Sequence, residues 1–317
     1  MAGSEFIARR FDPASDCARW NDMVARCRQA SFLFDRRYMD YHSDRFEDCS
    51  LMVFKGKRLA ALFPACIAGN TVSSHSGLTY GGLLTPSRAI AGDVAGALDA
   101  VNNYLASQGV NEVIYKPVPT VYHTVPAMED LYHLWRTVNP SFAGRQISST
   151  IDRDCRPRVF DIRRQGVRRA AEAGVVIEQS TDFAPFWDVL SSNLAERYGT
   201  RPVHSLDEIS LLAERFPKNI RLFVARLERR VIAGVVVYYT PMVAHSQYIS
   251  ASPEGKALGA LDLLFEKIIG PSLQECRFFD FGTSTEERGH YLNESLLYQK
   301  EGFGGRATLY DIYRYTL

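Results

Sequence analysis

The chain has 317 residues, which is more than one hydrophobic core usually supports, so we expect two domains. Hydrophobic residue types make up 46% of it and charged types 23%, a balance that excludes a disordered chain, a collagen and a coiled coil. Lys and Arg number 37 and Asp and Glu number 36, so the formal net charge is only +1. A generally basic surface for nucleic acid or an anionic membrane is therefore excluded, and any basic site must be local.

Two features of the chain favour a cytoplasmic location. No apolar run reaches the ~18 residues that a membrane-spanning helix needs, and the first residues lack the basic and apolar regions of a signal peptide. The six cysteines are scattered, with no Cys-x-x-Cys pair and no histidine at zinc spacing. We therefore expect reduced thiols, no metal site and no membrane insertion, while the oligomeric state stays open.

The same order of elements occurs twice: two apolar strands joined by a charged turn, a third strand, a helix and a fourth strand. We expect these elements at 50–63, 72–75, 93–106 and 112–115 in the first half, and at 219–238, 243–249, 259–269 and 277–281 in the second. Val53 and His75 are 22 residues apart, and Val224 and His245 are 21 apart. Any two α+β domains alternate strands and helices, but this matched spacing favours a duplication.

An arginine-rich stretch from Asp152 to Arg169 lies between the two copies and contains few apolar residues. Acidic residues alternate with the arginines, so a solvated linker is favoured over a phosphate or tRNA site. We therefore place the domains at residues 7–150 and 151–317. In the second half, Asp182 and the capping box Ser205–Glu208 indicate the starts of two helices.

A glycine-containing turn follows the third strand of the second half and opens its helix. Glycines allow a tight turn and the close approach of a ligand, and the N–H groups at a helix start favour an anion such as a pyrophosphate. A Gly-x-x-x-Gly turn also occurs for purely conformational reasons, but this position makes it a candidate cofactor-binding segment. Its residues are Ser250, Glu254, Gly255, Lys256, Ala257, Leu258, Gly259 and Ala260.

A second motif, Tyr298-Gln-Lys-Glu-Gly-Phe303, lies at the end of a helix expected at 293–301. Taken alone, it predicts only a helix that ends at Gly302 and a core contact by Phe303.

Together the two motifs resemble the GNAT superfamily of acyl-CoA N-acyltransferases. In that family the turn binds the pyrophosphate of coenzyme A and the tyrosine protonates the departing thiolate, which implies these roles for the 250–260 turn and for Tyr298. The family turn reads Gln/Arg-x-x-Gly-x-Gly/Ala; Lys256 and Gly259 match it, whereas Leu261 departs from it.

The whole chain further resembles the FemAB-like tandem-GNAT proteins. The segments that carry this resemblance include Ser74-His-Ser-Gly-Leu-Thr-Tyr-Gly-Gly82, Pro202-Val-His-Ser205, Phe279-Asp-Phe-Gly282 and Gly302-Phe-Gly-Gly305. It implies an α+β fold of two tandem GNAT-like domains, each a mixed central sheet flanked by helices.

Further residues could carry chemistry or hold the acceptor. His245, on a strand, and Glu286, after the last strand, are candidate general bases beside Tyr298, although a hydrogen-bonded strand histidine and a solvated loop glutamate are equally ordinary. The first half lacks a cradle-like turn, so its polar loop residues are assigned to the acceptor. The candidate acceptor-binding residues are His75, Tyr80, Lys116, Tyr122, His123 and His204.

The resemblance implies an N-acyltransferase that moves an acyl group from acyl-CoA, a co-substrate and not a bound cofactor, to the amine of a nucleotide-linked amino sugar. The amine would attack the thioester directly in a cleft between the domains, as a step of cell-surface polysaccharide biosynthesis. A Fem-type aminoacyl-tRNA-dependent peptidyl transferase for cell-wall precursors is the alternative, against which the near-neutral charge counts. A non-catalytic binding protein of the same fold stays open.

Overall fold

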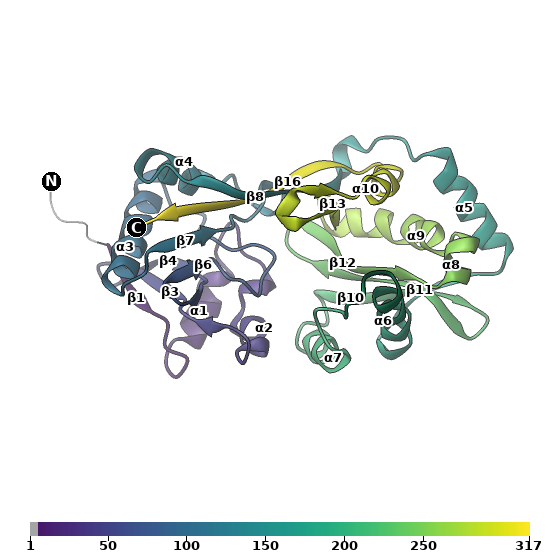
Figure 1. The fold of residues 1–317 in the computed structure, drawn as a ribbon, viewed down its shortest axis with the longest axis horizontal. Coiled ribbons are helices and arrows are strands. Elements are labelled where there is room, and N and C mark those ends of the chain that lie inside the picture. The colour runs from purple at the N-terminus through teal and green to yellow at the C-terminus, as the bar shows by residue number, and fades with distance from the viewer. Residues whose placement is uncertain (1–5) are drawn as a thin grey trace. The chain divides into compact units, whose positions relative to one another are not determined.

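The computed structural model describes residues 6–317, except for the side chains of residues 197 and 198. The chain divides into two compact units, whose elements are labelled in Figure 1. The first unit runs to Gln146 and includes Thr285–Tyr291 and Leu309–Leu317; the second comprises Ile147–Ser284 and Leu292–Thr308. The division near residue 147 lies close to the expected boundary. The sequence analysis assigned 285–291 and 309–317 to the second domain, whereas they belong to the first unit, where β16 pairs with β7.

The first unit contains two larger sheets, besides the short pair β14–β15. Strands β1, β3 and β4 form one, and β2, β5, β6, β7 and β16 form the other, in which only β6 and β7 are parallel. The elements are β1 (Phe6–Arg10), α1 (Cys17–Val24), α2 (Arg36–Met39), β2 (Glu47–Asp48), β3 (Leu51–Lys55), β4 (Arg58–Phe63), β5 (Cys66–Ala68), β6 (Thr71–Ser73), α3 (Ala91–Ser107), β7 (Glu112–Tyr115), α4 (Glu129–Thr137) and β14 (Thr285–Glu286). Strands β8 (Ser141–Asp152), β15 (Tyr291–Leu292) and β16 (Arg306–Thr316) contribute residues to both units.

The second unit is built on one mixed sheet in the order β9-β10-β11-β12-β13-β8, in which only β12 and β13 are parallel. Its elements are α5 (Asp161–Glu172), β9 (Val176–Ser180), α6 (Ala184–Tyr198), α7 (Leu206–Arg215), β10 (Ile220–Leu227), β11 (Arg230–Tyr239), β12 (Val243–Ala251), α8 (Pro253–Leu258), α9 (Ala260–Glu275), β13 (Phe278–Thr283) and α10 (Glu294–Glu301). The capping box of Ser205 and Glu208 is present at the start of α7, as predicted.

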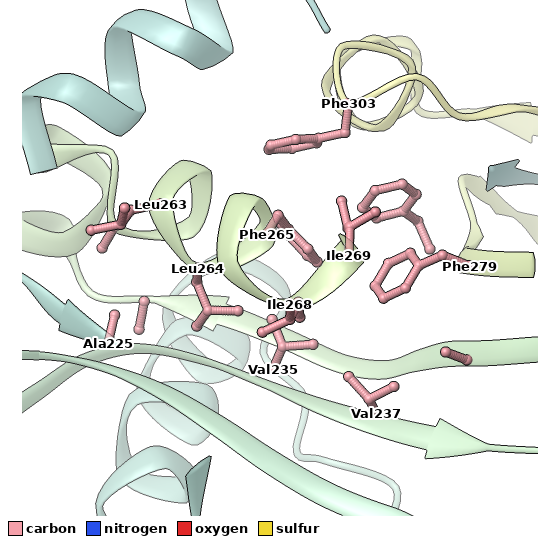
Figure 2. Close-up of a cluster of buried hydrophobic side chains, with 14 of the residues drawn as sticks. Ala225, Val235, Val237, Leu263, Leu264, Phe265, Ile268, Ile269, Phe279 and Phe303 are labelled. Carbon is pink, nitrogen blue, oxygen red and sulfur yellow. The ribbon is translucent and has the colours of Figure 1, made fainter. Parts of the chain in front are cut away.

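The two units share a crossover. In the first, α3 connects the parallel strands β6 and β7, and in the second, α8 and α9 connect β12 and β13. The predicted apolar face of α3 is buried in full. Figure 2 shows the corresponding core of the second unit, where Leu264 and Ile268 of α9 lie near Val235 and Val237, and Phe265 lies between the sheet and Phe303. The matched order of elements is therefore present in both halves.

The sequence predicted a solvated linker for the arginine-rich stretch, and this prediction is wrong. Most of it forms the end of β8 and helix α5, which packs on α9 in the second unit. Helix α5 buries Gly166 and Ala170, so its packing face is made of small residues. A face of this kind carries almost no hydrophobic signal, which is why the periodicity did not reveal the helix.

All six cysteines are free thiols. Among the residues that the structure describes, none of the helices is both long and apolar enough to cross a membrane.

The contact between α5 and α9 depends on two glycines. Gly259 has a φ of +78°, and a Cβ built on it would lie 2.7 Å from the carbonyl oxygen of Gly166. Gly166 in turn lies against the carboxylate of Asp262, so a Cβ there would collide with that side chain. Gly174 has nearly the same φ, +79°, but open space around it.

We therefore predict that Gly259→Ala destabilises the protein more than Gly174→Ala does. Both substitutions place a side chain in the left-handed region, at a cost of about 1–2 kcal/mol. Only the first also forces α5 away from α9, which should add about 2 kcal/mol or more. Urea unfolding of the two variants measures the difference. Equal losses would show that the backbone clash is relieved at no cost.

A second prediction concerns His75, which lies in the first unit at a φ of +82° and is 3% exposed. Its ring stacks on that of His42 at 5.6 Å, and its Nδ1 accepts a hydrogen bond from the N–H of Gly77. Burial, followed by the neighbouring His42, lowers the pKa of His75 to about 3. Below the ordinary histidine pKa of about 6.5, the unfolded chain therefore binds a proton that the folded protein does not.

The contribution of His75 to stability should be constant above pH ~6.5 and fall by up to about 1.4 kcal/mol per pH unit as the pH drops toward 3. His75→Asn removes this term, and asparagine tolerates the left-handed backbone. Unfolding free energies measured from pH 7 to pH 4 should fall less steeply for the variant than for the parent. Parallel curves would mean that His75 is protonated in the folded protein as easily as in the unfolded chain.

Candidate functional site

The parallel strands β12 and β13 pair over only three residues each, Val243–His245 with Phe278–Asp280. Strand β12 continues to Ala251, and a register shift against β11 leaves Gln247 as an extra residue after the paired part. Bulges bend a strand and increase its twist. Beyond the paired part, the backbone groups on one edge of β12 are therefore not used by β13, and the two strands bound a space between them.

A cavity of about 240 Å³ occupies this space. Its walls are mainly apolar side chains from α6, β12, α9, β13 and α10, with a few polar groups among them. The apolar residues are Leu190, Leu194, Ile249, Ala251, Leu261, Phe265, Phe281, Leu296 and Phe303, and the polar ones are Asn193, Ser250, Lys256, Gln299 and Lys300. An apolar pocket with a few convergent polar groups is the usual form of a small-molecule site.

A second cavity of about 270 Å³ adjoins the first, because Lys256, Leu261 and Gln299 line both. It is more polar and lies at the start of α9. Its other lining residues are Arg163, Gly255, Gly259, Asp262, Ser295 and Tyr298. The two cavities together lead from a charged region, with Arg163 and Lys256, into an apolar one.

Four of the eight predicted cofactor-binding residues line these cavities: Ser250, Gly255, Lys256 and Gly259. The other four do not: Glu254 pairs with Arg230, Ala257 is exposed, Leu258 packs on the core and Ala260 is fully buried. They fix the turn and do not border the space.

Local sequence explains the shape of this turn. Ser252 caps α8 by accepting a hydrogen bond from the N–H of Gly255, and Pro253 occupies the first helical position. Gly259 ends α8 in the left-handed region and at once begins α9. The first N–H groups of α9 have no acceptor within their own helix, so they favour an anion near the second cavity.

A polar cluster connects this turn to α6. The Asn193 side chain donates to the Ser250 hydroxyl and the Ala251 carbonyl at 2.7 and 2.6 Å, and it accepts from the Lys256 ammonium at 2.8 Å. Asn193 therefore holds Lys256 at the rim that both cavities share.

Lys300 enters the first cavity from α10 and is only 4% exposed. Its Nζ donates to the carbonyl oxygens of Gly282 and Thr283, each at 2.8 Å. Burial lowers the pKa of Lys300 to about 8, against the opposing effect of the Asp280 carboxylate. An ammonium has three N–H donors, so one is left for a group in the cavity.

His245 lies beside this lysine in a hydrogen-bonded chain. Its Nδ1 is 2.8 Å from Oδ2 of the fully buried Asp280, whose other oxygen accepts from Ser148 and Thr150. A Cβ built on Gly282 would be 3.4 Å from the His245 ring. A carboxylate that fixes a histidine ring is the usual arrangement for a positioned base, but His245 does not line either cavity.

The structure separates the other two candidate catalytic residues. Tyr298 is 57% exposed, lines the second cavity and packs its ring on Phe160 at 5.4 Å. Glu286 is exposed and belongs to the first unit, whereas the cavities lie in the second. The structure therefore does not bring Glu286 into the cavity region described above.

Five of the six candidate acceptor-binding residues lie in the first unit. The Lys116 ammonium donates to the Leu78 carbonyl at 2.6 Å, and burial lowers its pKa to about 8. Tyr80 packs on Tyr122 at 4.7 Å.

Two histidines among these candidates, one in each unit, are each held by a neighbour in their own unit. An Nε2 of His123, in the first unit, lies 2.9 Å from the Val118 carbonyl, and burial lowers its pKa. His204 is in the second unit, where its Nδ1 lies 2.5 Å from the Tyr248 hydroxyl.

The sequence analysis missed Lys300, Asp280, Asn193 and Arg163. A signal existed for two of them. Lys300 follows Leu296 by four residues and precedes Phe303 by three, so it lies on the apolar face of its helix. Asp280 interrupts the aromatic strand 277–281. A charge within an apolar pattern of either kind indicates a buried functional group.

Comparisons with known proteins agree with this architecture. Residues 161–291 match the family model described as an acetyltransferase (GNAT) domain. A comparison with curated protein sequences gave no significant match.

Several solved structures share the fold. FemX is 10% identical, with a TM-score of 0.67 over 98% of this chain and 97% of its own. The C-terminal domain of a putative lysylphosphatidylglycerol synthetase from Agrobacterium fabrum is 16% identical, with a TM-score of 0.62 over 96% of this chain and 92% of its own. A conserved protein of unknown function from Bacteroides thetaiotaomicron is 11% identical, with a TM-score of 0.62 over 98% and 99%.

The predicted fold class, α+β with two tandem GNAT-like domains, is therefore confirmed. The cavities and the β12–β13 divergence lie largely within the part that matches the family model. Helix α10 follows this part and contributes Leu296 and Lys300 to the first cavity. Residues 161–291, most of which belong to the second unit, are thus similar to a GNAT acetyltransferase domain.

Proposed function

We propose that the protein is an N-acyltransferase that transfers an acyl group from acyl-CoA to an amine, with the donor bound in the two joined cavities of the second unit. The observation that carries this proposal is the opening between β12 and β13, a mainly apolar space that continues into a charged one at the start of α9. Acyl-CoA has the same division, with an uncharged arm and a phosphorylated end.

The donor's polar groups have counterparts along this path. Lys256 and the first turn of α9 would hold phosphate, and the free edge of β12 would bond the amides of the pantetheine arm. The apolar walls would exclude water from the thioester. The first cavity is of the size expected for part of such a ligand, since a cavity of ~150 Å³ accepts a molecule of benzene.

The reaction needs a proton acceptor and a proton donor. The amine nitrogen forms a bond to the thioester carbon, the tetrahedral intermediate collapses as the C–S bond breaks, and the ammonium proton leaves while the thiolate is protonated. We assign the proton acceptor to His245, which Asp280 orients. Lys300 is a matched proton donor, because its pKa of about 8 is close to the ~8.5 of a thiol. Tyr298, which the family motif suggests, is the alternative proton donor.

We propose a nucleotide-linked amino sugar as the acceptor. A free small amine would not require a first unit of this size, whereas a carrier with a diphosphate would. Turnover of the same amino sugar with and without its nucleotide tests this part, and equal rates would remove it.

The fold shared with FemX supports a second candidate, the Fem-type transfer of an aminoacyl group from tRNA in synthesis of cell-wall precursors. The two donors are easily distinguished by binding. Coenzyme A is a small anion, whereas tRNA binding by surface phosphate contacts weakens steeply with salt.

We predict that coenzyme A stabilises the protein and that filling the first cavity, between β12 and β13, prevents this. At a hundred times its Kd a ligand adds about 2.7 kcal/mol, which raises the melting temperature by several degrees. Leu194→Trp narrows the cavity from α6 and should weaken binding at least tenfold. Leu211→Trp, at an exposed position on α7 that lines neither cavity, is the matched control. Stabilisation by charged tRNA but not by coenzyme A would favour the Fem-type reaction.

A further prediction separates the roles of Lys300 and Tyr298. Lys300→Met keeps the length of the side chain and removes the ammonium, so kcat should fall by about 10²–10⁴-fold. Tyr298→Phe should lower kcat toward the lower end of that range if its hydroxyl delivers the proton. Coenzyme A affinity of each variant checks that the site is intact. A kcat for Tyr298→Phe within twofold of the parent at every pH would leave the tyrosine only its packing on Phe160.

A further inference from the structure

An acidic residue lies where the donor's phosphates are expected. Asp262 is in the first turn of α9 and lines the second cavity together with Arg163 and Lys256. An anion at this end of a helix is favoured by the helix dipole. The carboxylate of Asp262 therefore already occupies an environment that a phosphate of the donor would use.

This carboxylate is built into the fold. Its Oδ1 accepts from the Arg163 guanidinium at 2.8 Å, and the two side chains are 8% and 17% exposed. Gly166 of α5 has no Cβ at the point where Asp262 approaches its backbone, so a glycine in a helix interior makes room for the acid. Glycine is an unfavourable residue there, which indicates that the position of Asp262 matters to the fold.

The neighbouring positions also limit the space for phosphate. Gly259 lies against Gly166, so α5 covers one side of the turn. Leu261 stands where the family turn has Gly or Ala, and its side chain lines both cavities. The charged residues that line the second cavity are Arg163, Lys256 and Asp262, and their charges sum to a single positive charge.

We propose that Asp262 is a specificity determinant of the donor site: its carboxylate takes the place of one phosphate of a diphosphate, so the site favours a donor with a single phosphate group near α9. Arg163 is neutralised by Asp262, which leaves Lys256 and the remaining N–H groups of α9 for that phosphate. This inference rests on the proposed binding of a pantetheine-type donor in the second unit.

The test compares three probes that share the pantetheine arm: coenzyme A, which has a diphosphate, 4′-phosphopantetheine, which has one phosphate, and pantetheine, which has none. Calorimetric Kd values are measured for the parent, for Asp262→Asn and for the smaller Asp262→Ser. Asp207→Asn is the matched control, because Asp207 is also a first-turn acid, on α7, and lines neither cavity.

Removal of the carboxylate should tighten coenzyme A about tenfold, since a charge at a helix end changes affinity by roughly two- to thirtyfold. The gain for 4′-phosphopantetheine should be under threefold, and pantetheine and the Asp207 control should not change. Should Asp262→Asn fail to fold, the serine variant, which keeps a hydrogen-bonding side chain in the first turn, gives the same comparison.

Unchanged or weaker binding of coenzyme A by the Asp262 variants would overturn the inference, as would an equal gain for all three probes. If pantetheine binds the parent in these cases, the proposed donor site stands and only the role of Asp262 is wrong. If no probe binds the parent or any variant, the proposed function fails, and the inference fails with it.

Discussion

The early end of pairing between β12 and β13 is the constraint on which the site depends. Two parallel strands that stayed paired would use their facing backbone groups and close the sheet. Here pairing stops after His245 and Asp280, and the extra residue Gln247 bends β12 away. The sheet thus gives up hydrogen bonds inside a folded domain, a cost that is offset only if water or a ligand satisfies these groups. In the proposed function, the donor satisfies these groups, so the open edge is where the donor would bind.

The helices around this opening divide its chemistry. Helix α9 contributes Phe265 to the apolar end and its N-terminus to the charged end, so one element spans both environments. Helix α10 brings Lys300 to the carbonyl groups at the end of β13, where a buried ammonium is stable only because two acceptors replace its water. Because the same two carbonyls lie next to the His245–Asp280 chain, the proton donor and the proton acceptor of the proposed reaction are held by one stretch of backbone.

The elements that the sequence predicted are those with strong local signals. The hairpin strands, the faces of α3 and α9, the capping box at Ser205 and the helix that ends at Gly302 follow from periodicity and capping alone. Helix α5 was missed because its packing face consists of small residues. Of the site, the turn at 250–260 was found through its glycines. The pairings of Lys300 with Gly282 and of Arg163 with Asp262 join residues 18 and 99 positions apart, and no local pattern contains such distances.

In the first unit, the chain itself covers the edge that corresponds to the open edge of β12. In the first unit, the chain that leaves β6 continues beside β7: Ser74 donates to the Ile114 carbonyl, and Gly81 donates to the Lys116 carbonyl. A Cβ on Gly81 would collide with the Ser74 carbonyl, so the loop is packed against itself.

Lys116, buried like Lys300, donates to the Leu78 carbonyl of this same loop. The backbone groups that β12 leaves open in the second unit are thus satisfied by the chain itself in the first. In the proposed reaction, the second unit thus keeps an open edge for the acyl donor, whereas the first unit fills the corresponding edge and is assigned to the acceptor.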